Sequence, residues 1–265
     1  MIMTVQVFQQ PGQLALPNGW HGYQPPMQGI RFLLHGHQKA GKTSLGDSGP
    51  RPVLLLDAEQ AGLWTPSRKI TWDPSRETCP VPDGSWDTCV VRVSDYQGPM
   101  SLLQLLQSGR HPFNSVTMDS TSSVQQRAIM SMAGMRKMER DQWGQLLRII
   151  NAMITGYGDL VTNPVRKVWA VTFITGTAFD HASRKWRPML QGQSRDFVPY
   201  VPEMTGWVYA AGDNTRHLWI GPSNDYETGN RLWGRLPDDM QLGYPGVVPG
   251  WTIETMVSQA LGLGQ

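Results

Sequence analysis

The chain has 265 residues and a net charge of +2, which excludes a strong overall field as the basis for binding nucleic acid. Its apolar residues, 40% of the total, form no run of membrane-spanning length, and the start "MIMTVQVFQQPGQ" lacks a signal-peptide pattern. We therefore expect a cytoplasmic protein with no membrane partner. Cys79 and Cys89 form no metal pattern, which predicts free thiols in a reducing compartment, with one loop disulfide as the alternative.

The first part of the chain, residues 1–28, is rich in Gln, Gly and Pro and predicts an N-terminal arm or hairpin. Residues 29–265 are expected to form a single domain. Short apolar runs in this domain predict strands at 30–34, 51–57, 88–93, 113–120 and 167–175, with two more at 206–212 and 216–221. Residues 62–87 show no clear period and predict a loop or insertion.

Helical spacing is visible between these strands. One helix is expected at 99–107 and a longer helical region after residue 120, whose second half starts with Asp141 as N-cap. The second half carries an apolar stripe made of Trp143, Leu146, Leu147, Ile150 and Ile154. Strands that are continuous apolar runs and alternate with helices predict an α/β fold with a mainly parallel central sheet and helices on both faces.

A phosphate-binding pattern follows the first strand of the domain. The segment "GHQKAGKT" has the spacing G-x-x-x-x-G-K-T, in which glycines turn backbone N–H groups toward phosphates, the lysine reaches the outer phosphates and the hydroxyl binds Mg²⁺. The alternative is a glycine-rich turn with a solvated lysine. The predicted nucleotide-binding residues are Gly36, His37, Gln38, Lys39, Ala40, Gly41, Lys42, Thr43 and Ser44.

Two acids at strand ends extend this site. Asp119 ends the strand in "SVTMDS" and is expected to hold Mg²⁺ together with Thr43, whereas its other role would be to cap the following helix. Glu59, just past the strand in "LLLDAEQ", is expected to polarise the water that attacks the γ-phosphate, and Asp57 to have a structural role. The alternative is that Asp57 and Glu59 are two surface acids.

The stretches "LLLDAEQ" and "VTMDS" together resemble the RecA/Rad-type recombinase ATPase core. The compact "GKTSLGDSGPRPVLLLDAE" and the stretch "HPFNSVTMDS" are most similar to the short phage RecA-like ATPases associated with single-strand annealing. This resemblance implies a RecA-like P-loop NTPase core that uses ATP and Mg²⁺, binds single-stranded DNA and assembles with itself into a ring or filament. It also implies a bacterial host's cytoplasm and a phage single-strand-binding protein as a further partner.

The chain departs from that family in two places. The family usually ends its next strand with a Gln or His that senses the γ-phosphate, whereas "VTFITGTAFD" offers Thr175 and Thr177. The helix after the phosphate-binding loop also contains Gly46 and Asp47, which are poor helix formers.

The resemblance also points to DNA-binding residues in the loop after that strand. The loop carries basic side chains around an indole that offers a stacking face, namely Arg184, Lys185, Trp186, Arg187 and Arg195. The alternative is a solvated loop whose tryptophan packs on the domain edge. Arg231 and Arg235 are expected to reach a neighbouring subunit's nucleotide, or else to be surface arginines near a turn.

The function expected from the sequence is an ATP-dependent, single-stranded-DNA-binding recombinase of phage type, acting in homologous recombination or annealing. Two other functions stay open. One is a P-loop phosphotransferase or nucleotide kinase, which needs an arginine-rich lid over a small acceptor. The other is a non-catalytic ATP-binding scaffold of a phage complex, which the missing Gln or His favours and Glu59 opposes.

Overall fold

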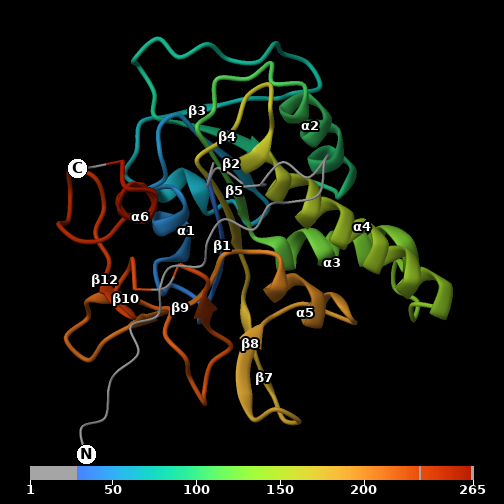
Figure 1. Cartoon of the computed structure of the whole chain (residues 1–265). Coiled ribbons are helices and arrows are strands. Elements are labelled where there is room, and N and C mark those ends of the chain that lie inside the picture. The colour runs from blue at the N-terminus through green and yellow to red at the C-terminus, as the bar shows by residue number, and fades with distance from the viewer. Residues whose placement is uncertain (1–28, 233, 264–265) are drawn as a thin grey trace, which may run out of the picture.

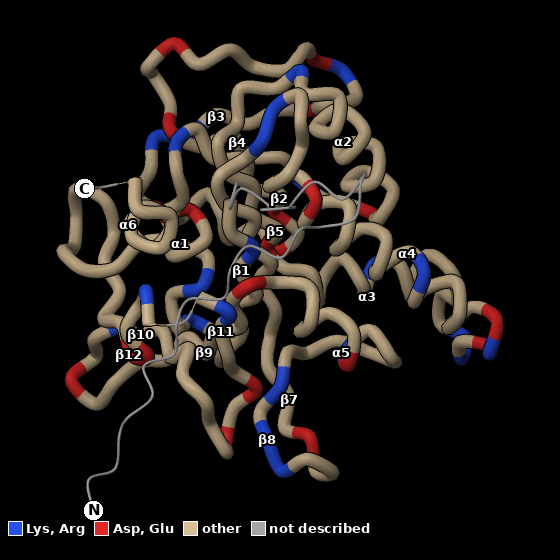
Figure 2. The backbone as a smooth tube through the Cα atoms, in the orientation of Figure 1, with Lys and Arg blue, Asp and Glu red and all other residues tan. Residues whose placement is uncertain are grey.

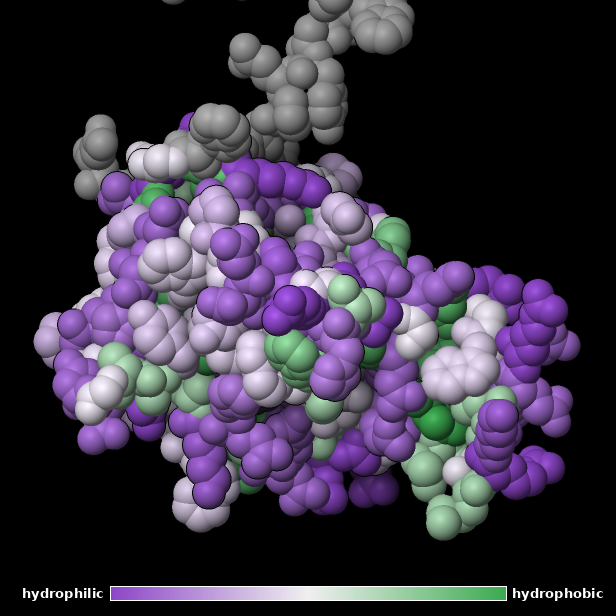
Figure 3. All heavy atoms as spheres, turned by 90° about the horizontal axis from the view of Figure 1, so that it is seen from below, coloured by the Kyte–Doolittle hydropathy of each residue, from purple (hydrophilic) through white to green (hydrophobic). Residues whose placement is uncertain are grey.

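A computed structural model describes residues 29–232 and 234–263 (Figure 1). The arm or hairpin expected at residues 1–28 lies outside this range. No helix in the described part of the chain is both long and apolar enough to cross a bilayer. The face shown in Figure 3 is mainly hydrophilic, although hydrophobic side chains gather at the end formed by α3 (Thr121–Ala133) and α4 (Arg140–Gly158).

The fold is α/β, and its centre is a large, mostly parallel sheet. Seven strands run parallel in the order β3-β4-β2-β5-β6-β1-β9. They are β1 (Ile30–His35), β2 (Val53–Asp57), β3 (Lys69–Thr71), β4 (Thr88–Arg92), β5 (Ser115–Asp119), β6 (Ala170–Ile174) and β9 (Met204–Ala210). The strands β10 (Arg216–Trp219) and β12 (Asp239–Gln241) extend the sheet antiparallel beyond β9, and β11 (Gly229–Asn230) also pairs with β9. A separate hairpin of β7 (Thr177–Asp180) and β8 (Lys185–Pro188) projects from the body (Figure 1).

Helices cover both faces of this sheet, as the sequence predicts. The short α1 (Lys42–Gly46) and α6 (Ile253–Leu261) pack on one face, and α2 (Gln97–Gln107), α3 and α4 pack on the other. The alternation of side chains along β1 divides the core accordingly, because Phe32 and Leu34 join the cluster under α1 and α6 while Leu33 joins the opposite cluster. Shorter elements are α5 (Ser194–Phe197) and the 3₁₀ turns η1 (Gly62–Trp64), η2 (Asp159–Thr162) and η3 (Val198–Tyr200).

The predicted apolar runs all form strands, and the runs at 206–212 and 216–221 pair as antiparallel neighbours. The start of α4 was predicted wrongly. Its N-cap is Glu139 rather than Asp141, because the backbone N–H of Glu139 donates to Gln142 Oε1 at 2.9 Å and closes the first turn two residues earlier. Within residues 62–87, for which the sequence predicts a loop or insertion, η1 and the edge strand β3 occur. Both cysteines are free.

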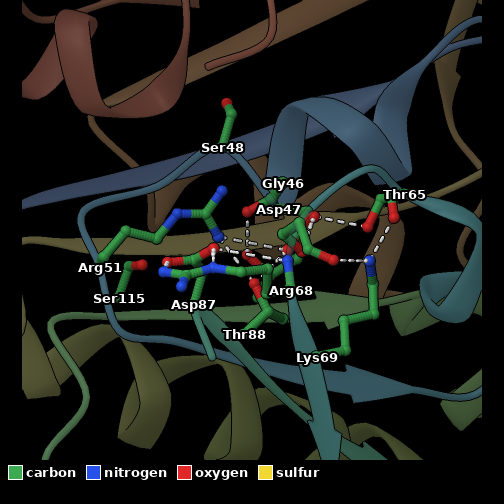
Figure 4. Close-up of polar contacts among 12 residues, drawn as sticks. Gly46, Asp47, Ser48, Arg51, Thr65, Arg68, Lys69, Asp87, Thr88 and Ser115 are labelled. Atoms are coloured by element: carbon green, nitrogen blue, oxygen red, sulfur yellow. Dashed lines mark hydrogen bonds and ion pairs between the residues drawn. The ribbon is translucent and has the colours of Figure 1, made fainter. Parts of the chain in front are cut away.

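The C-terminal end of α1 is fixed by Gly46 and Asp47. A Cβ at Gly46 would lie 2.6 Å from Thr117 Cγ2, so only glycine lets the helix approach the sheet this closely. The buried Asp47 carboxylate accepts hydrogen bonds from four hydroxyl groups and faces the guanidinium of Arg51 at 3.5 Å (Figure 4). The four donors are Thr65, Ser67, Thr88 and Tyr244. These two poor helix formers therefore end the helix and anchor it.

Candidate functional site

The phosphate-binding pattern forms the turn between β1 and α1. Gly36 lies against β9, where a Cβ would come 2.2 Å from Val208 O, and Gly41 has a φ of 102° that favours glycine. The Lys42 ammonium donates to the carbonyls of Gly36 and His37, at 2.9 and 2.7 Å. Burial lowers the pKa of Lys42, while the nearby carboxylates of Asp119 and Glu59 oppose that shift.

Asp119 is brought to this turn by the parallel register of the sheet. It ends β5 directly beside Asp57 of β2 and Ile174 of β6. Its side chain is buried, and Oδ2 has no hydrogen-bond partner among the described residues. Burial raises the pKa of Asp119 to about 6, against the opposing effect of a hydrogen bond from the Thr43 hydroxyl.

These two side chains fit a Mg²⁺ ion. The Thr43 hydroxyl and the unpartnered Asp119 carboxylate oxygen are the hard oxygen ligands that Mg²⁺ prefers. The described residues contain no group of three or more His, Cys, Asp and Glu side chains that could hold a metal. Mg²⁺ commonly keeps several waters and takes further oxygens from phosphates rather than from a protein cage.

Glu59 lies opposite the loop, on the turn after β2. Asp57 builds this turn, because its carboxylate accepts from the backbone N–H groups of Glu59 and Ala61 at 3.1 and 3.2 Å. The structural role expected for Asp57 is confirmed. The exposed Glu59 carboxylate accepts from the hydroxyls of Ser120 and Ser123, the latter at 2.8 Å, so it is held beside the end of β5.

A cleft of about 1060 Å³ joins these groups. It is lined by the phosphate-binding turn except Ala40, and by Glu59, Asp119, Thr175 and Thr177. Ala40 is instead buried in the core. Such a volume is at the upper end of the range for small-molecule sites, about 300–1,000 Å³. Parallel strands therefore bring predicted residues from four distant segments into one cavity.

The two threonines after β6 occupy different environments in this cleft. Thr175 is fully buried, and its hydroxyl has no partner in the described part of the chain. Thr177 donates to the carbonyl of Arg187 at 3.1 Å and lies 3.4 Å from His35 Nδ1. Their assignment as γ-phosphate sensors stays a prediction.

The basic segment predicted as a loop forms the β7–β8 hairpin, along which cationic and acidic residues lie side by side (Figure 2). Arg187 faces three carboxylates, those of Asp180, Asp196 and Glu227, at 3.1–3.5 Å. Arg195 lies 3.6 Å from Asp196. Lys185 donates to the carbonyl of Ser223 at 2.7 Å, and Arg184 is exposed at the hairpin tip with a φ of 58°.

Trp186 is half-buried, pairs with Phe179 across the hairpin and packs on rings of the phosphate-binding turn and β9. Its ring centroid lies 5.0 Å from His37 and 5.4 Å from Phe179. A DNA-binding role for this segment stays a prediction. Because most of its cations already face carboxylates or carbonyls, Arg184 is the cation best placed for a phosphate.

Two further arginines lie outside the cleft. Arg231 donates to the carbonyl of Tyr200 at 2.6 Å, and Arg235 donates to the carbonyl of Ala260 at the end of α6. Their action on a neighbouring subunit stays a prediction.

Sequence reasoning missed two features of the cleft. Trp64 lines it with 88% of its surface exposed, and Ser120 holds Glu59 in place. Trp64 lies in residues 62–87, whose sequence shows no pattern that would indicate an exposed indole beside a cavity. Ser120 belongs to the stretch "VTMDS", but an uncharged side chain gave no signal for a role in the site. No protein-family model matches the chain, and none of the curated proteins compared with it matches either.

Proposed function

We propose that this chain is a Mg²⁺-dependent ATPase with a RecA-like P-loop core. The observation that carries the proposal is the meeting of Lys42, Thr43, Glu59 and Asp119 in one cleft. In phosphoryl transfer to water, Lys42 suits the neutralisation of phosphate charge and Glu59 suits the role of general base. Thr43 and Asp119 suit the binding of the metal ion. The exposed Trp64 offers a flat face for the base of the nucleotide.

The roles of the residues follow from their surroundings. Lys42 offsets charge on the outer phosphates with backbone N–H groups of the turn beside it. Thr43 and Asp119 would hold Mg²⁺, which neutralises the developing phosphate charge when it is bound. Glu59 would orient a water and take its proton, since its second carboxylate oxygen carries no hydrogen bond from the described residues.

We further propose that the chain binds single-stranded DNA, forms a ring or filament with copies of itself and acts in phage-type recombination or annealing. The support is the sequence resemblance together with the hairpin that leaves the nucleotide cleft after β6 and carries Arg184 and Trp186. A kinase lid is supported less, because Arg187 already faces three carboxylates.

The first test is binding and turnover of ATP. Lys42→Ala should remove most nucleotide binding measured by calorimetry, because backbone amides alone hold β- and γ-phosphate charge less well. Lys167→Ala is the matched control, since its ammonium stacks on Trp169 at 4.1 Å, and neither residue lines the cleft. Equal ATP affinity in both variants would rule out this site. Phosphate release stimulated by single-stranded DNA separates the recombinase from a kinase, and its absence with intact binding favours the scaffold.

A further inference from the structure

Two histidines flank the first glycine of the phosphate-binding turn, in the sequence His35-Gly36-His37. The proposed hydrolysis gives neither side chain a chemical role. His35 lies beside Thr177 of β7, and His37 lies beside Trp186 of β8. The turn that would hold phosphate therefore touches the segment proposed to hold DNA.

His35 is the fixed member of the pair. It is fully buried, and its ring nitrogen Nε2 lies 2.8 Å from the carbonyl oxygen of Glu227. Its other ring nitrogen, Nδ1, lies 3.4 Å from the hydroxyl of Thr177, the first residue of β7. The ring also packs edge-on to Trp207 with centroids 5.2 Å apart.

His37 is exposed and makes its contacts through the ring. Its centroid lies 5.0 Å from Trp186 of β8 and 5.2 Å from Trp207, both in edge-to-face arrangement. Trp186 is in turn held by its backbone, since its N–H donates to Asp225 O at 2.7 Å and its carbonyl accepts from Glu227 N–H at 2.8 Å. A displacement of the His37 ring would therefore act on a residue whose backbone is fixed in β8.

Phosphate binding would change the hydrogen bonds that Lys42 makes within the turn. Its ammonium has three N–H donors, and two of them already serve the carbonyls of Gly36 and His37. A lysine that donates to both a β- and a γ-phosphate oxygen has one donor left, so one carbonyl must be released. The hydrogen bond from Lys42 to the Gly36 carbonyl is partly buried, whereas the hydrogen bond to the His37 carbonyl is exposed. Release of the His37 carbonyl is therefore the smaller change.

We propose that His37 is a positioning residue that couples the nucleotide cleft to the β7–β8 hairpin. This inference rests on the proposed nucleotide function. When Lys42 turns to phosphate, the freed His37 peptide reorients and its ring shifts against Trp186. The hairpin thus responds to the triphosphate through a contact at the opening of the turn.

The test is hydrogen exchange of the hairpin amides, residues 177–188, with and without a saturating non-hydrolysable ATP analogue and Mg²⁺. Calorimetry on the same samples gives the affinity, so each protein is compared at full occupancy. In the wild type the analogue should change exchange by about two- to tenfold, the range that one edge-to-face aromatic contact can supply. His37→Ala should lose this response, and His37→Phe should keep it because the aromatic edge remains.

His181→Ala is the matched control, since His181 lies at the hairpin tip, beyond the Phe179–Trp186 pair, and does not belong to the phosphate-binding turn. It should respond like the wild type. Trp186→Ala removes the other side of the contact and should lose the response even if His37→Ala binds nucleotide too weakly to saturate. An unchanged response in His37→Ala or Trp186→Ala, or no response in a wild type that binds the analogue, would overturn the coupling. A wild type that binds no analogue by calorimetry would overturn the proposed function itself.

Discussion

Replacing Asp119 by Asn should make the protein more stable while it removes Mg²⁺-dependent turnover. The carboxyl of Asp119 is buried, and burial raises its pKa from the ordinary 3.8 to about 6. The folded protein therefore binds this proton more tightly than the unfolded chain does. Ionisation above pH 6 costs folding free energy, which a neutral amide of the same shape avoids.

The magnitude follows from the two pKa values. A difference of about two units corresponds to about 3 kcal/mol, since one unit is about 1.4 kcal/mol. The cost is absent below pH 3.8, where the carboxyl is protonated in both states, and it is complete above pH 6. At pH 5 about half of it is present. Asp119→Asn should thus gain about 3 kcal/mol at pH 8 and about half of that at pH 5.

Urea unfolding of both proteins at pH 5 and pH 8, without Mg²⁺ or nucleotide, measures this difference. Addition of Mg²⁺ and ATP should then stabilise the wild type more than the variant, because stabilisation by a ligand grows with its affinity and the variant lacks one Mg²⁺ ligand. A variant less stable than the wild type at pH 8, or a difference independent of pH, would refute the idea that Asp119 is held ionised at a cost.

Three other outcomes are expected. Glu59→Gln should still bind ATP but slow its hydrolysis by about 10²–10⁴-fold in a phosphate-release assay, and normal turnover would place the base elsewhere. Gly46→Ala should cost about 1–3 kcal/mol in urea unfolding, since its Cβ would overlap Thr117; an unchanged midpoint would contradict this packing. In single-strand binding at several salt concentrations, Arg184→Ala should flatten the salt slope by about 0.7, whereas Trp186→Ala should cost about 1–3 kcal/mol per stacked base at constant slope. Equal DNA affinity of both variants and the wild type would show that the hairpin does not bind DNA.

The central sheet was predictable because its strands are short, continuous apolar runs whose acids mark the carboxyl ends. Asp57 and Asp119 each close such a run, and parallel pairing then places them side by side. The same register places the end of β2 at the cleft, so that Glu59, two residues beyond this strand, also lines it.

The hairpin could not be predicted in the same way. Its residues read as a basic loop, yet Arg187 forms ion pairs with Asp196 and Glu227, which lie 9 and 40 positions away along the chain. Sequence patterns describe neighbours within a few residues, whereas this segment is organised by partners from other elements. The same holds for Asp47, which looks unsuited to its helix until its four hydroxyl donors are assembled around it.

That assembly has a consequence for the order in which the protein matures. The Asp47 carboxylate is bonded to Tyr244 at a separation of 197 positions, and the start of α6 is bonded to Ser48 through the backbone N–H of Ile253. Contacts this distant along the chain close late in folding, because they carry the largest loop-closure cost. The phosphate-binding turn near the N-terminal end is therefore stiffened only when the C-terminal segment docks. A nascent chain whose residues 244–253 are still inside the ribosome would present the full sequence of the turn but not yet its shape.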